Sequence, residues 1–97
     1  MINLQVRSES GTIQARAEHG VVWGPELARL DHSVFPMLGH LLPYADAAFN
    51  SRQVSSLLGE VPRLPPGVVT DEFASELLEL GQKVLDGQHL YLWFVGD

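Results

Sequence analysis

Apolar and polar residues alternate along the first part of the chain. Every second residue is apolar from Ile2 to Val6, and the same period returns from Ile13 to Ala17. A period of two predicts half-buried β-strands over residues 2–7 and 12–17. The polar run between them ends in Gly11, which can adopt the positive φ that short hairpin turns require. We therefore expect a hairpin whose apolar set, Ile13 included, faces the core.

The middle of the chain is apolar but interrupted. Residues 31–49 contain two prolines and a glycine, which break any helix or strand longer than a turn or two and predict a packed irregular segment. A short helix is expected to start at Pro25, since proline is favoured at the first helical position. Asn50 with Gln53 forms a capping-box variant, which predicts a helix over 51–60.

The last third contains the longest periodic element. Thr70 is a helix cap, and apolar residues spaced as on one helical face predict a helix that ends before Gly87. Residues 89–95 are apolar on both strand faces, which is typical of a strand buried on both sides and favours a central place in a sheet. The alternative is that one of these faces, which carries Tyr91 and Trp93, is left for a partner.

These elements predict a single α+β domain over residues 1–97. We expect an antiparallel sheet of about three strands, made by the N-terminal hairpin and the C-terminal strand, packed against two to three helices. A chain of this length forms one core.

Composition excludes several classes of function. The chain has 97 residues, no cysteine and a net charge of -6. Without cysteine there is no disulfide, thiolate nucleophile or cysteine-based metal site. The negative charge argues against nucleic acid, which is bound through lysine and arginine. No apolar run is long enough to cross a membrane, and the first residues do not resemble a secretion signal, so we expect a cytoplasmic protein.

The candidate catalytic chemistry is sparse. The histidines lack the spacings of zinc sites, and the glycines lack those of phosphate-binding loops, so we expect no metal and no cofactor. A serine nucleophile elbow is also missing. These absences predict a protein that is not an enzyme. The rival hypothesis is a small hydrolase that uses the Asp46 carboxylate with His32 or His40, although an aspartate in a loop is more often a turn or cap acceptor.

Two stretches, together with the helix just after the first, carry a resemblance to a known family. They are VFPMLGHLLPYADAAFN at residues 34–50, which contains the PYADAAFN element, and the terminal YLWFVGD at residues 91–97. Together they resemble a family of small acidic bacterial proteins, frequent in actinobacteria and described as hypothetical. The resemblance implies that residues of both stretches belong to one pattern: Tyr44, Asp46, Phe49, Asn50, Gly96 and Asp97. It implies no activity or catalytic residue.

The charge distribution indicates a kind of partner. Residues 64–97 carry a net charge of -5, and such a field speeds encounter with a basic molecule. The simpler interpretation of the acidic residues on the predicted helix after Thr70 is that they form an ordinary solvent-exposed polar face. The leading hypothesis is a protein-binding module, such as an immunity or antitoxin-like inhibitor of a basic partner; the alternative is a self-associating structural protein, for example a homodimer. The expected partner-binding residues are Asp71, Glu72, Glu76, Glu79, Tyr91, Trp93, Tyr44 and Asp46.

Overall fold

The sheet has one more strand than the periodicity predicts. The structure is a computed structural model that describes residues 1–42 and 44–96, so Pro43 and Asp97 of the family-like pattern lie outside the described residues. The strands in this part of the chain are β1 (Ile2–Ser8), β2 (Ile13–Arg16), β3 (Ala47–Phe49) and β4 (Leu90–Gly96). The helices are α1 (Pro25–Ala28), α2 (Ser51–Glu60) and α3 (Asp71–Asp86), with short 3-10 turns η1 (Leu38–His40) and η2 (Val61–Arg63).

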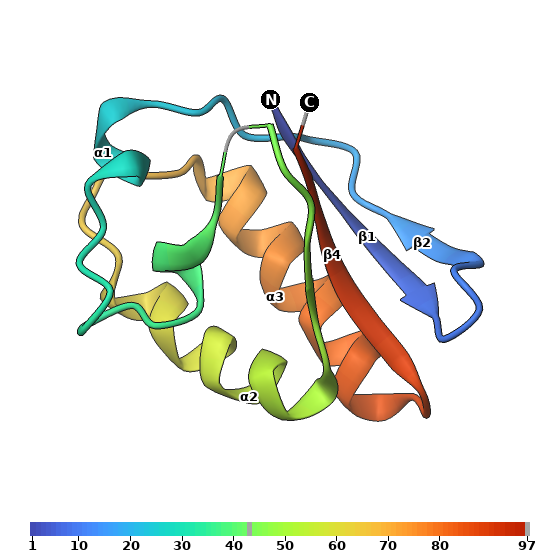
Figure 1. Ribbon diagram of the computed structural model, residues 1–97. Coiled ribbons are helices and arrows are strands. Elements are labelled where there is room, and N and C mark those ends of the chain that lie inside the picture. The colour runs from blue at the N-terminus through green and yellow to red at the C-terminus, as the bar shows by residue number, and fades with distance from the viewer. Residues whose placement is uncertain (43, 97) are drawn as a thin grey trace.

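The strand order is β2-β1-β4-β3, and all neighbouring strands are antiparallel (Figure 1). β4 pairs with β1 along its whole length and with β3 on its other side, which confirms the α+β class and the central place predicted for the C-terminal strand. β3 was not predicted, because three residues are too few to show a period.

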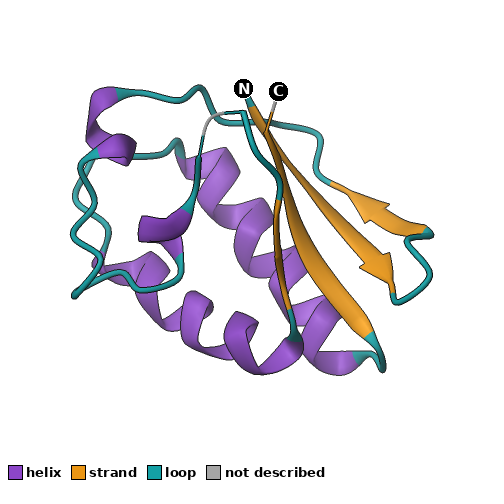
Figure 2. Cartoon of the chain, in the orientation of Figure 1, coloured by secondary structure: helices purple, strands orange, loops and turns teal. Residues whose placement is uncertain are grey.

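Both main helices lie on one side of the sheet (Figure 2). The side chains that β1 and β4 turn toward them are buried: Ile2, Leu4, Val6, Leu92 and Phe94. The predicted apolar stripe of α3 packs against them and is buried at Phe73, Leu77, Leu80 and Val84. Gly81 lets α2 approach α3 closely, since a Cβ at this position would lie 2.6 Å from Leu58 Cδ2. One face of the sheet therefore forms the core with the helices.

The prediction that Ile13 is buried is wrong. Its side chain is 36% exposed, because the pairing of β1 with β2 shifts by one residue between Val6 and Arg7. Arg7 pairs with Ile13 while Val6 pairs with Ala15, so Gln14 is an extra residue in β2. Such a bulge moves the residues beyond it to the other face of the sheet.

The predicted N-terminal capping residues of α2 and α3 are confirmed. Asn50 Oδ1 accepts a hydrogen bond from the Gln53 amide, and the Gln53 side chain accepts one from the Asn50 amide, each at 2.9 Å. Thr70 Oγ1 accepts the Phe73 amide at 3.1 Å. These bonds satisfy donors that the first helical turn leaves free, which is why the motif alone places the helix start.

A buried carboxylate holds the irregular middle of the chain. Glu60, at the end of α2, is 1% exposed, and its two oxygens accept the amides of Met37 and Leu38, each at 3.0 Å. A buried charge is tolerated only where such bonds compensate its lost hydration. Glu60 therefore fixes the start of η1 against α2.

Candidate protein-binding surfaces

The face of the sheet that turns away from the helices carries the predicted aromatic pair. Tyr91 and Trp93 are half-buried, so the prediction that β4 is buried on both sides is wrong. That this face is left for a partner stays a prediction. We call this surface the aromatic sheet face. It consists of residues paired across β1 and β4: Asn3 with Val95, Gln5 with Trp93, and Arg7 with Tyr91. Within residues 1–42 and 44–96, the two main helices pack on the opposite side of the sheet and leave these rings uncovered by a helix (Figure 2).

The guanidinium of Arg7 lies over the Trp93 ring. The Arg7 guanidinium carbon lies 4.3 Å from the ring centroid, within the range of a cation–π contact. Arg7 Nε also donates a hydrogen bond of 2.8 Å to Gln5 Oε1. The cluster shows that this ring is positioned and oriented to take a guanidinium.

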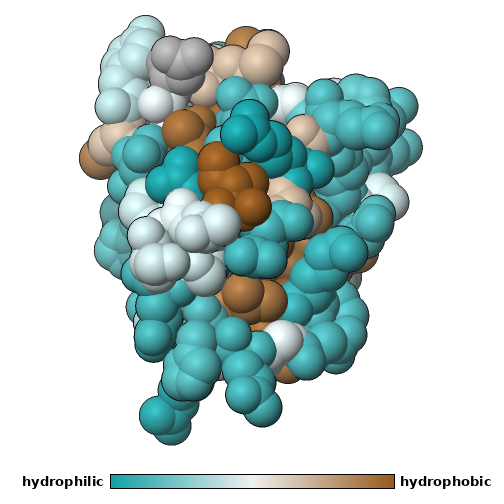
Figure 3. All heavy atoms as spheres, turned by 90° about the vertical axis from the view of Figure 1, so that its right-hand side faces the viewer, coloured by the Kyte–Doolittle hydropathy of each residue, from teal (hydrophilic) through white to brown (hydrophobic). Residues whose placement is uncertain are grey.

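A shallow hollow of about 380 Å³ lies at one end of the aromatic sheet face. Its lining residues come from the end of β1, the β1–β2 turn, β3 and β4: Ser8, Glu9, Gly11, Ala48, Tyr91 and Trp93. Figure 3 views the strand side of the molecule, where hydrophobic atoms lie in the middle among hydrophilic ones. The hollow combines two aromatic rings with one carboxylate.

Glu9, the charged group of this hollow, was not identified from the sequence because it lies in a turn. Its side chain is 60% exposed, and its Oε1 lies 3.2 Å from Nδ1 of His89, whose side chain is 74% exposed. His89 has a φ of 56°, in the left-handed region that favours glycine. An exposed contact of this kind contributes little to the free energy of folding, and solvent or a ligand can readily replace it.

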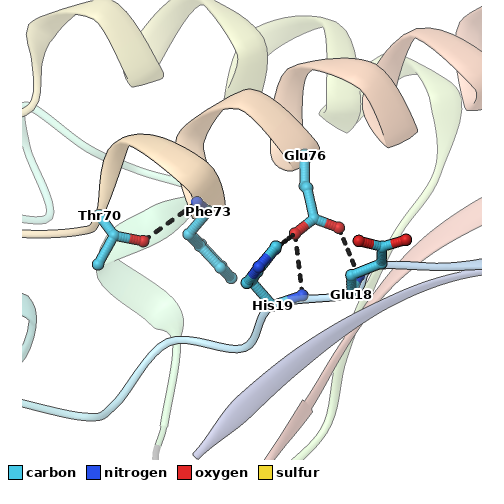
Figure 4. A network of polar contacts seen from close by, with 5 residues as sticks. All are labelled: Glu18, His19, Thr70, Phe73 and Glu76. Carbon is cyan, nitrogen blue, oxygen red and sulfur yellow. Dashed lines mark hydrogen bonds and ion pairs between the residues drawn. The ribbon is translucent and has the colours of Figure 1, made fainter.

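Glu76, one of the predicted partner-binding residues, forms hydrogen bonds within the molecule (Figure 4). Its carboxylate accepts the amide of Glu18 at 2.5 Å and that of His19 at 2.9 Å, and His19 Nδ1 donates to it at 2.6 Å. Partial burial raises the pKa of Glu76, but these hydrogen bonds outweigh it and hold the pKa below its ordinary value of 4.5. Glu76 therefore clamps the segment after β2 to α3.

The other predicted acidic residues are divided between surfaces. Glu72 and Glu79 line an open groove of about 410 Å³ together with Glu76, Glu18 and Arg16. We call it the acidic groove. Asp71 lines hollows on other sides of α3, formed with the loop before the helix. The structure thus brings together Glu72, Glu76 and Glu79, with Glu18 as an addition, and separates Asp71 from them.

Asp46 and Tyr44 do not belong to either surface. Asp46 Oδ1 accepts the Gly96 amide at 3.0 Å, which ties the start of β3 to the end of β4. This contact joins two residues of the family-like pattern. Tyr44 is 84% exposed on the preceding turn. The bond of Asp46 is that of a structural acceptor.

The histidines near the middle of the chain lie close together. The rings of His32 and His40 have centroids 5.1 Å apart. Among residues 1–42 and 44–96, however, no group of three or more histidine, aspartate or glutamate side chains is placed to hold a metal ion. Asp31 beside them accepts the Ser33 hydroxyl and amide at 2.7 and 2.8 Å, and these bonds lower its pKa. That carboxylate is therefore engaged in a local turn.

Comparison with known proteins returned no match. No family model, no curated protein and no solved structure matches the chain significantly. The resemblance to small acidic actinobacterial proteins stays a prediction. Within the described part of the chain, the helices are too short or too polar to span a lipid bilayer.

Proposed function

We propose that this chain is a non-catalytic protein-binding module for a basic partner, in the manner of an immunity protein or antitoxin. The observation that carries the proposal is the aromatic sheet face of an acidic molecule. Tyrosine, tryptophan and arginine are enriched where proteins bind each other. Tyr91, Trp93 and Arg7 meet on a face that no helix in the described part of the chain covers.

The charge of the molecule supports a partner of opposite sign. The net charge is -6, and the exposed carboxylates of the acidic groove concentrate part of it beside α3. Such a field raises the association rate of a basic protein, while the aromatic contacts set how long the complex lasts. The two surfaces therefore have different parts in binding.

The test uses the products of the adjacent genes as candidate partners. Each is purified, and its association rate with this chain is measured at low and at physiological salt. We expect one basic product to bind with a rate that falls steeply as salt rises. The variant Glu72→Lys with Glu79→Lys should slow association further than the control Glu26→Lys with Asp86→Lys, which changes the net charge equally. Glu76 is left unchanged because its reversal would break the clamp.

A salt-independent association, or equal effects of both charge variants, would contradict this function. Self-association is the second candidate, and the half-buried aromatic rings together with the exposed Ile13 favour it. Sedimentation at two protein concentrations separates the candidates. The fraction of a homodimer formed through the aromatic sheet face rises with protein concentration, and salt does not weaken it because salt screens the repulsion between two acidic copies.

A further inference from the structure

The hollow at the end of the aromatic sheet face has the components of a cation site. We propose that it receives one lysine or arginine side chain of the basic partner, with the apolar stem on Tyr91 and Trp93 and the charged head at Glu9. This inference rests on the proposed function and names the group that is recognised. The volume of about 380 Å³ is at the small end of ligand sites and suits one long side chain.

The chemistry of the lining favours a cation over a neutral or acidic group. Aromatic faces attract ammonium and guanidinium groups, and long basic side chains lay their methylene stems along apolar surface. Glu9 is the charged residue in the lining, and its exposed contact with His89 can be exchanged for a stronger partner. The ring of Trp93 demonstrates the same preference by its contact with Arg7.

Arg7 then acts as an internal competitor. Its guanidinium occupies the Trp93 ring and places a like charge beside the hollow, so an incoming cation must displace or tolerate it. Removal of this side chain should strengthen binding. A second copy of this chain is a less favourable occupant, because two molecules of net charge -6 repel each other.

The experiment is a nuclear magnetic resonance titration at low salt with a short peptide of alternating glycine and lysine, and with its arginine counterpart. A peptide with norleucine in place of lysine is the neutral control. We expect the basic peptides to shift the Trp93 indole and Glu9 amide signals. Glu9→Gln should weaken binding about three- to tenfold, and Glu79→Gln, with the same charge change in the acidic groove, should have a smaller effect.

Two further variants sharpen the result. Arg7→Gln should tighten binding about two- to fivefold, while Arg52→Gln, which also removes one positive charge but at a distant site, should change it less. Trp93→Leu keeps an apolar side chain without an aromatic face and should weaken binding. Its fold is checked by circular dichroism, and the exposed Glu9 variant answers the question even where Trp93→Leu unfolds.

The outcomes separate the inference from the function on which it rests. Signals that shift only around Glu72 and Glu79, unaffected by Glu9→Gln, would overturn the cation hollow and leave a basic partner standing. Equal binding of the norleucine peptide, or no binding of any basic peptide at millimolar concentration, would overturn the hollow as well. Shifts of Tyr91 and Trp93 that depend on protein concentration alone would identify a second copy as the occupant. The failure of every adjacent gene product to bind would instead count against the proposed function.

Discussion

Removal of the buried Glu60 carboxylate should destabilise the protein more than any exposed substitution. In Glu60→Ala, the amides of Met37 and Leu38 lose their acceptors while they stay in the protein interior. Each unsatisfied buried donor costs about 1–3 kcal/mol, so the free energy of unfolding should fall by about 4 kcal/mol. A domain of this size has a total of about 5–15 kcal/mol. The variant therefore loses a large share of its stability but is expected to stay folded without urea.

Urea unfolding followed by circular dichroism measures this loss. With a slope of about 1.5 kcal/mol per molar urea, a loss of about 4 kcal/mol lowers the unfolding midpoint by about 2.7 M. Glu60→Gln keeps one acceptor oxygen and replaces the other with a donor, so it should retain one of the two bonds and lose about half as much. Amide exchange at Leu38 should accelerate in both variants.

The control is Glu79→Gln, which makes the same chemical change on the exposed side of α3 and should alter stability by less than about 0.5 kcal/mol. A free energy of unfolding of Glu60→Ala within about 0.5 kcal/mol of that of the control would refute the reasoning. It would mean that Met37 and Leu38 find water or another acceptor at no cost. An unchanged Leu38 exchange rate would lead to the same conclusion.

Three other predictions concern single contacts. The folded-state pKa of Glu76 lies below 4.5, so its ionised carboxylate stabilises the fold above pH 4.5, and this stabilisation is lost as the pH falls through the lower folded-state pKa. Between neutral pH and that lower pKa, the urea midpoint of Glu76→Gln should therefore depend less on pH than that of the unmodified chain. His89→Gly should raise the free energy of unfolding by about 0.5 kcal/mol, since glycine relieves the positive φ, whereas His89→Ala should bring no gain in thermal unfolding. Asp46→Ala should cost less than about 1 kcal/mol but speed amide exchange at Gly96, and Asp46→Asn, which keeps an acceptor oxygen, should restore slow exchange; equal exchange in both variants would contradict the assigned contact.

The sequence alone determined the elements that depend on neighbouring residues. The capping box at Asn50, the cap at Thr70 and the apolar period of α3 involve side chains only a few positions apart, so their geometry follows from the local spacing. The apolar pattern of residues 89–95 also placed β4 correctly at the centre of the sheet. It left open whether the face with Tyr91 and Trp93 would also be covered.

Contacts between distant segments decided the rest. Glu60 bonds to amides 22 and 23 residues away, and Glu76 to the Glu18 amide 58 residues away. No local period marks such a partner, so both glutamates read as ordinary helix residues. The bulge at Gln14 and the three-residue strand β3 likewise form only through pairing with another strand. β2 pairs with the edge of β1, and β3 pairs with the edge of β4. The aromatic sheet face stays open because both long helices pack on the same side, and this choice depends on the free energy of burying the whole core rather than on any single stretch of sequence.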